Sequence, residues 1–82
     1  MSTRVLIWHP PGTATNANNP NNWDIQAGGT PVSILPTDEL RLNSTSTNSC
    51  IFTANLNVDC VVIAATYSAG TFDTNGNNLT LN

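Results

Sequence analysis

The side chains that could do chemistry in this chain are few: five carboxylates, one histidine and two cysteines. Glycan hydrolysis needs two carboxylates about 5 to 9 Å apart, and Asp59 and Asp73 lie on successive strand-like segments. Acids in such sequence are more commonly turn-forming or solvated, and Asp38 and Asp73 lie in or beside turns. We therefore expect no catalytic pair among the acids, which are Asp24, Asp38, Glu39, Asp59 and Asp73.

His9 stands in no nucleophile motif, and Pro10 and Pro11 follow it directly. We therefore expect a surface residue at a strand end, not a general base. A calcium site built from Asp59, Asp73 and nearby Asn side chains would resemble calcium β-rolls, but their Gly-Gly-x-Gly-x-Asp repeat is absent. The sequence predicts no enzyme activity, no metal and no cofactor.

Cys50 and Cys60 leave two interpretations open. Neighbouring strands could bring their Cβ atoms within about 4 Å, as a disulfide requires. Alternatively both are buried thiols, because free Cys is among the most buried residue types. Neither cysteine has a second ligand at the spacing of a metal site.

Charge is scarce: 9% of the residues are charged, the net charge is −3, and Arg4 and Arg41 are the only fixed cations. Nucleic acids and anionic membranes are bound by clusters of Lys and Arg, so we expect neither partner. No apolar run approaches the roughly 18 residues of a membrane span. The run 4–8 is too short for a signal peptide, so we expect a complete chain from Met1 without a secretion signal.

Alternating apolar residues in 49–82 predict the main elements of the fold. Eight of them share one parity, so extended chain would point all eight into one core. The other parity turns apolar at Val61, Ile63 and Ala65, so we expect the middle of the run to be covered on both faces. Strand-like segments begin near residues 50, 60, 70 and 79. The eight residues of equal parity are Cys50, Phe52, Ala54, Leu56, Val58, Cys60, Val62 and Ala64.

The chain is predicted to be a single small all-β domain, 1–82. Residues 1–12 form an N-terminal arm or strand, 13–37 are loops rich in Asn, Gly and Pro, and 38–82 are the β-rung core. A chain of this length buries little more than about 60% of its extended surface, so oligomerisation is expected to complete the core. Two architectures stay open, a short β-helix-like domain or a β-sandwich, and in either case we expect completion by intertwining in a trimer.

The order of motifs in 18–82 resembles the opening rungs of right-handed β-helix (β-solenoid) domains, which occur in bacterial surface proteins and in virion proteins of tailed bacteriophages. This chain departs from the pattern by stopping after one or two rungs. The resemblance therefore implies an end that partner chains cover. The motifs are Asn21-Asn22-Trp23, Gly28-Gly29, Pro36-Thr37-Asp38-Glu39-Leu40, Cys50-Ile51-Phe52-Thr53-Ala54-Asn55 and the closing run 70–81 from Gly-Thr-Phe-Asp to Leu-Thr-Leu.

These features together predict a structural virion protein: a capsid decoration or cement protein of a bacteriophage that stabilises the shell by protein–protein contacts. Its expected partners are copies of itself, in a trimer, and the major capsid protein or another virion protein, at the capsid surface. The candidate capsid-contact arm, which would add a strand to a neighbour, is Arg4, Val5, Leu6 and Ile7. The expected shared core, with the tryptophans as end caps, is Phe52, Leu56, Val58, Val62, Ile63, Trp8 and Trp23.

The alternative is a carbohydrate-binding or adhesin-like β-solenoid module of a bacterial surface protein or phage tail fibre, with an extracellular or cell-surface location. In that case Trp8, Trp23 and Tyr67 would stack on sugar rings while Asn side chains bond the hydroxyls. This alternative predicts exposed aromatic rings and a glycan partner. The structural hypothesis predicts buried rings and a protein partner.

Overall fold

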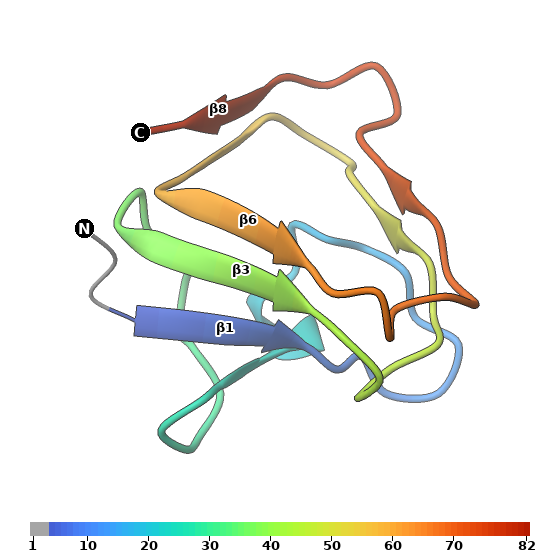
Figure 1. The fold of residues 1–82 in the computed structure, drawn as a ribbon. Helices are drawn as coiled ribbons and strands as arrows, with labels where there is room; N and C mark the ends of the chain where they lie inside the picture. The colour runs from blue at the N-terminus through green and yellow to red at the C-terminus, as the bar shows by residue number, and fades with distance from the viewer. Residues whose placement is uncertain (1–3) are drawn as a thin grey trace.

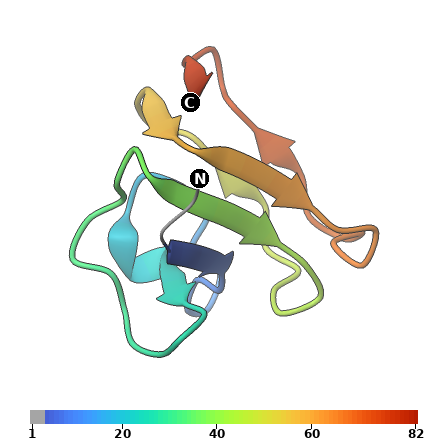
Figure 2. The ribbon, with the colours of Figure 1, turned by 60° about the vertical axis from the view of Figure 1, so that its left-hand side comes forward.

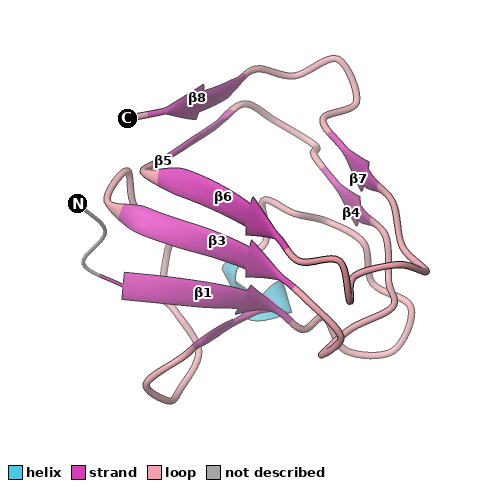
Figure 3. Ribbon diagram, viewed as in Figure 1, coloured by secondary structure: helices cyan, strands magenta, loops and turns pink. Residues whose placement is uncertain are grey.

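A computed structural model describes residues 4–82 as an all-β fold of eight short strands and one single-turn 3-10 helix, with no α-helix among these residues (Figures 1 and 3). In chain order the elements are β1 Arg4–Trp8, η1 Pro20–Asn22, β2 Trp23–Ile25, β3 Asp38–Leu42, β4 Cys50–Ile51, β5 Leu56–Val58, β6 Cys60–Ile63, β7 Phe72–Asp73 and β8 Leu79–Leu81.

The largest sheet has four strands in the order β2-β1-β3-β6. The pairs β1–β3 and β3–β6 are parallel, and β1–β2 is antiparallel. Strand β1 ends at Trp8, because Pro10 and Pro11 follow and proline cannot donate to a ladder. Strand β3 alternates buried and half-buried residues along its length, as expected for a strand with one face on the core.

Two further parallel ladders, β4–β7 and β5–β8, complete the pairing. Leu40 lies opposite Val61, Cys50 opposite Phe72, and Leu56 opposite Leu79, so partners are 21, 22 and 23 residues apart in sequence. Residues 60–81 therefore run alongside residues 38–58 on all three ladders. We call 38–58 the middle layer, 60–81 the C-terminal layer and 4–25 the N-terminal layer; the N-terminal and C-terminal layers lie at opposite ends of the stack (Figures 1 and 2).

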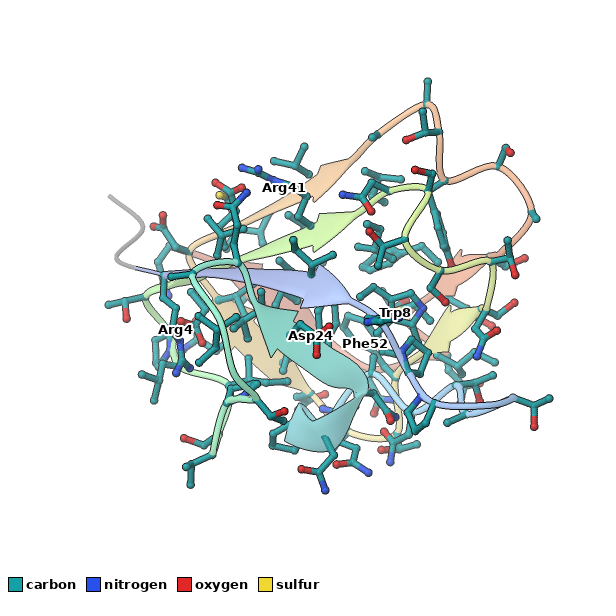
Figure 4. The ribbon with its side chains drawn as sticks, turned by 90° about the horizontal axis from the view of Figure 1, so that it is seen from below. Arg4, Trp8, Asp24, Arg41 and Phe52 are labelled. Carbon is teal, nitrogen blue, oxygen red and sulfur yellow. The ribbon has the colours of Figure 1, made fainter. Side chains whose placement is uncertain are left out.

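Most of the core lies inside the N-terminal and middle layers, and Tyr67 and Phe72 join it from the C-terminal layer. Two edge-to-face aromatic contacts help to fill it: the ring centroids of Trp8 and Trp23 are 4.9 Å apart, and those of Phe52 and Phe72 are 5.4 Å apart. Arg41, by contrast, projects from the outer side of β3 (Figure 4). The buried apolar residues are Leu6, Trp8, Ala17, Trp23, Leu40, Leu42, Cys50, Phe52, Leu56, Val58 and Tyr67.

The expectation that eight residues of equal parity share one core needs correction at the corners of the chain. Cys50, Phe52, Leu56 and Val58 are buried, but Ala54 between them is exposed. The reason is that β4 and β5 are separate strands in different sheets, and the chain bends between them. Alternation predicts facing only while the backbone stays extended.

A second corner at Asp59 reverses the parity that faces the core. After this residue the pairing places Val61 opposite Leu40 and Ile63 opposite Leu42, so Val61 and Ile63 take the inward positions. Three members of the predicted set are consequently displaced: Val62 is exposed, and Cys60 and Ala64 are only half-buried.

The predicted capsid-contact arm, Arg4, Val5, Leu6 and Ile7, belongs to β1, which lies inside the four-stranded sheet with β2 on one edge and β3 on the other. Because these edges pair within the chain, β1 is not free to add itself as a strand to another protein. Contact of these residues with a capsid stays a prediction. The N-terminal arm predicted at 1–12 also includes residues 1–3, which lie outside the described residues.

An ion pair fixes the start of β1 against β3. Asp38 is fully buried, and its two carboxylate oxygens each accept a 2.8 Å hydrogen bond from the Arg4 guanidinium, through Nε and Nη2. The Leu35 backbone N–H donates a further bond of 2.7 Å to Asp38 Oδ2. The hydrogen bond that Arg4 donates to the Asp38 carboxylate raises the pKa of Arg4 above its usual value, against a smaller lowering by burial. The buried carboxylate is thus fully bonded by β1 and by the loop before β3.

Replacing Asp38 should therefore be costly. Asp38→Ala removes the acceptor of two Arg4 hydrogen bonds and of the Leu35 N–H, so that Arg4 keeps only its bond to the Ser33 carbonyl, and we expect the free energy of unfolding to fall by about 2 to 3 kcal/mol. Urea denaturation at neutral pH, followed by circular dichroism, measures the change. The matched control is Asp73→Asn on an exposed strand, with a change within about 0.5 kcal/mol. Equal midpoints for Asp38→Ala and the control would contradict the assignment.

Candidate functional site

Among residues 4–82, the acids, His9 and the cysteines form close pairs but no larger cluster. His9 Nδ1 is 2.6 Å from Asp24 Oδ2, at the end of the β1–β2 pair, and both side chains are about half exposed. Asp59 precedes β6 in the four-stranded sheet, whereas Asp73 lies on β7 in another sheet. In residues 4–82 no group of three His, Cys, Asp or Glu side chains is placed to hold a metal ion, and no ligand-sized pocket opens. No helix in the same range is long and apolar enough to cross a membrane.

The two cysteines are not bridged to each other in this structure. Cys50 lies in β4 inside the core, and burial raises the pKa of its thiol to about 12. Cys60 lies in β6 in a different sheet, half-buried, with Sγ 3.6 Å from Glu39 Oε1. Of the two interpretations left open by the sequence, the structure corresponds to unbridged thiols, with only Cys50 fully buried.

The three aromatic residues proposed for sugar stacking are turned inward. Trp8 and Trp23 are fully buried, and Tyr67 is nearly so. The polar atom of each side chain donates a hydrogen bond to a backbone carbonyl. Trp8 Nε1 donates to Asn48 O over 3.0 Å, and Trp23 Nε1 donates to Ala17 O over 2.9 Å. The Tyr67 hydroxyl donates to Asn48 O over 2.6 Å. Their rings are therefore not presented for stacking on a sugar.

The predicted shared core divides into two groups in the single chain. Phe52, Leu56 and Val58, like both tryptophans, are buried. Val62 and Ile63 are 43% and 48% exposed. The exposed pair lies on β6, the outermost strand of the four-stranded sheet.

Exposure of inward-facing apolar residues marks one end of the stack. In the middle layer, Leu42 and Val58 are buried, whereas their respective partners in the C-terminal layer, Ile63 and Leu81, are 48% and 54% exposed. Within residues 4–82 no strand pairs with the far edges of β6, β7 and β8. We call this surface the open end; its inward-facing residues are Val61, Ile63, Phe72, Leu79 and Leu81.

The other end of the stack is covered. Strand β2 occupies the outer edge of β1, and Trp23 on β2 packs its ring edge-to-face against Trp8. Asn22, in the 3-10 helix that leads into β2, is buried and donates through Nδ2 to Asn16 O over 2.9 Å. The two ends of the fold therefore differ: one is closed by the chain's own residues, and the other presents strand edges and apolar side chains.

The outer face of the four-stranded sheet is a second surface with a mixed character. Two rows of side chains cross the outer side of the sheet: Val5, Glu39 and Cys60 form one, and Ile7, Arg41 and Val62 form the other. Arg41 Nη2 and Nε both bond Glu39 Oε2 within this face. The charges of Glu39 and Arg41 thus pair with each other, and the neighbouring side chains on this face, Val5, Ile7 and Val62, are apolar. We call these six residues the outer sheet face.

Asparagines at the corners join the layers to one another, which the sequence interpretation missed. Asn18 Oδ1 accepts from the backbone N–H groups of Thr53 and Ala54 over 2.8 and 3.2 Å, and its Nδ2 donates to the carbonyls of Ala54 and Asn55 over 3.3 Å. One layer on, Asn55 Oδ1 accepts from the Asn78 N–H over 2.9 Å. The sequence feature that could have predicted these contacts is the recurrence of Asn at the corners. Without the structure, these segments read only as polar loops.

Removing the Asn18 side chain should loosen the corner between β4 and β5. Asn18→Ala loses hydrogen bonds to the backbone of the middle layer, and water can reach the freed groups because the contact is exposed. We expect the free energy of unfolding to fall by about 1 to 2 kcal/mol. Asn21→Ala, at an exposed position of the 3-10 helix, is the matched control and should change it by less than about 0.5 kcal/mol. A loss no larger than the control's would show that the corner contacts carry no net stability.

Alkaline pH should unfold the chain through Cys50. Its folded pKa, about 12, exceeds the ordinary thiol value of 9.0, so the unfolded chain releases this proton first. The contribution of the protonated Cys50 thiol to stability is fully present below about pH 9 and is lost as pH rises towards 12. Burial also raises the pKa of Tyr67, which adds a loss of the same sign above pH 10.0, the ordinary tyrosine value.

Urea unfolding at a series of pH values measures this dependence, with Cys50→Ala as the control that removes the thiol contribution. An identical pH dependence in both proteins would contradict the assigned cause.

Comparison with known proteins gave no match: no family model, no curated protein and no solved structure matches this chain. Its function is therefore inferred from its own residues, pairing and surfaces.

Proposed function

We propose that this chain is a structural, non-enzymatic virion protein, a capsid decoration or cement protein of a bacteriophage. The observation that carries the proposal is the set of three parallel ladders whose partners are 21 to 23 residues apart. The chain returns once to the same three strand positions after this interval, and this arrangement resembles two neighbouring rungs of a β-helix, in which each rung contacts only its neighbours. The covered N-terminal end serves as the cap of such a stack.

Stacked β-rungs offer extended, rigid outer surfaces, and here one of them suits a protein partner. The outer sheet face places Val5, Ile7 and Val62 around a Glu39–Arg41 ion pair. Apolar side chains around a partnered charge resemble the apolar core and polar groups of protein–protein interfaces. We assign the capsid contact to this face, which retains Val5 and Ile7 of the sequence-predicted arm but uses their side chains in place of a strand edge.

The low charge of the chain supports a protein partner of this kind. A surface with few fixed charges pays little desolvation cost when it is buried against another protein. The proposal retains the expected partners, which are the major capsid protein or another virion protein together with further copies of this chain. In this role the bound copies hold neighbouring capsid subunits together and resist expansion of the shell.

The alternative glycan-binding role loses its proposed contacts in this fold, because Trp8, Trp23 and Tyr67 are buried. Stacking of a sugar on any of these rings would require the core to open. Binding to a glycan therefore remains only as one of the possible results of the binding experiment described next.

Binding to capsids tests the proposal. Capsids assembled without this protein are incubated with it at about 1 μM, a concentration at which an interface of standard size is normally occupied, and are then sedimented. We expect co-sedimentation and a higher temperature of capsid disruption. Val62→Glu should weaken binding at least about tenfold by burying an unpaired charge.

The matched control is Val32→Glu. Val32 is 95% exposed and lies in the loop between β2 and β3, so this variant should bind as the native chain does. Absence of native binding, or equal binding by Val62→Glu, would overturn the proposal. Binding to glycans, with Val62→Glu unaffected, would point to the adhesin-like alternative.

A further inference from the structure

We propose that Asn75 is a site of spontaneous covalent modification, at which the side-chain amide is lost by cyclisation onto the backbone nitrogen of the next residue. Asn75-Gly76 is the one Asn-Gly pair in the sequence. It lies in the turn between β7 and β8, at a corner of the stack (Figure 3). The modification does not involve any residue of the outer sheet face, so it goes beyond the proposed capsid contact, and the two can succeed or fail independently.

The reaction needs only the chain and water. The Gly76 backbone nitrogen attacks Cγ of Asn75, the new C–N bond closes a succinimide ring, and the side-chain NH2 leaves as ammonia with the proton that the Gly76 nitrogen releases. Attacking and attacked atoms are joined through the Asn75 backbone, so the step is intramolecular. Water then adds OH to either ring carbonyl carbon and H to the ring nitrogen, and the bond between these ring atoms breaks. The product is aspartate or isoaspartate, and no atom is oxidised or reduced.

The turn leaves the attacking nitrogen without a competing hydrogen bond. Asn75 and Gly76 both have positive φ, 53° and 77°. The turn is closed by the Asn77 N–H, which donates to Thr74 O over 2.9 Å, and the Asn75 N–H donates to Asp73 Oδ1 over 2.8 Å. Among the described residues, no group accepts a hydrogen bond from the Gly76 N–H between these two donors. No hydrogen bond must therefore break before this nitrogen attacks.

The approach to the Asn75 side chain is open. Gly76 has no side chain, and a Cβ atom placed on it would meet no atom within 4 Å, so nothing screens its nitrogen. Both residues are exposed to the water that the second step consumes. This exposure is a property of the corner itself. By the β4–β7 register the equivalent residues of the middle layer are Thr53 and Ala54, which are also exposed although their layer lies between the other two.

The side-chain amide that is lost ties the turn to the middle layer. Asn75 Nδ2 and Asn77 Nδ2 both donate to the Phe52 carbonyl, over 3.3 and 3.4 Å. A carboxylate at position 75 cannot donate, and its negative charge lies near this carbonyl oxygen and near the carboxylate of Asp73. Isoaspartate also lengthens the backbone of the turn by a carbon atom. Conversion should therefore loosen β8 from β5 and leave the four-stranded sheet unchanged.

Mass spectrometry of the intact chain, held folded at mildly alkaline pH, tests the inference. We expect the mass gain of an NH2-to-OH exchange, which fragmentation should place at Asn75 at a rate at least about tenfold above that of any other Asn. An isoaspartyl methyltransferase should transfer methyl groups to the isoaspartate part of the product.

Two variants in the same corner separate the proposed reaction from general deamidation. Asn75→Gln lengthens the side chain and disfavours ring closure, so the mass gain at this position should slow at least about tenfold. Asn78→Gln is the matched control, because Asn78 is also exposed in this corner but is followed by Leu79, whose side chain hinders attack. This control should leave the rate at Asn75 unchanged.

Amide hydrogen exchange before and after conversion measures the structural consequence. Amides in β8 should exchange about fivefold faster after conversion, as expected for the loss of one hydrogen bond, while those in β1 and β3 should not change. A gain that appears first at another Asn, an equal rate in Asn75→Gln, or unchanged exchange in β8 would overturn the proposal. So would a folded chain that keeps its mass while the urea-unfolded chain converts at Asn75. If Asn75→Gln loses its β-type circular dichroism, the site found by fragmentation of the native chain decides.

Discussion

The fold depends on one constraint: every strand must find a backbone partner, and this short chain finds most of them in the layer before or after. Strand β3 is the clearest case, since β1 pairs with one of its edges and β6 with the other. Because all three ladders between the middle and C-terminal layers are parallel, no hairpin can form them, and the chain must travel around the core to return. The long path between partners is thus a consequence of the pairing direction.

Polar side chains complete the pairing where ladders stop. At the corner after β4, Asn18 bonds backbone groups of Thr53 and Ala54 that no strand reaches, and at the start of the sheet Asp38 binds Arg4 across two strands. These contacts differ in burial. The Asn18 corner is exposed, so water competes with it, whereas Asp38 is fully buried and needs its partner. An uncharged corner residue and a single buried ion pair therefore suit a chain with very few charges.

The sequence predicted those parts of the fold that local alternation controls. The all-β class and the strands beginning near residues 50, 60, 70 and 79 follow from alternation within a few residues, and both agree with the structure. The prediction of which side chains point into the core was wrong wherever the chain turns a corner. At Asp59 the corner reverses the parity of the inward-facing residues, so Val61 replaces Val62 as the inward residue. The place of β1 inside a sheet depends on partners 15 or more residues away, which alternation does not encode. The apolar residues of the candidate site could be identified from the sequence, but their exposure to solvent could not be predicted from it.

The two ends of the stack of layers differ in how they are covered. An uncovered end of such a stack leaves strand edges and core side chains in water. At one end the antiparallel strand β2 and the two tryptophans form a cap. At the other end of the described residues no strand pairs with the far edges of β6, β7 and β8, and Ile63 and Leu81 are 48% and 54% exposed. The parallel pairing that builds the layers therefore leaves unpaired edges on the last described strands, because no antiparallel strand covers them within residues 4–82.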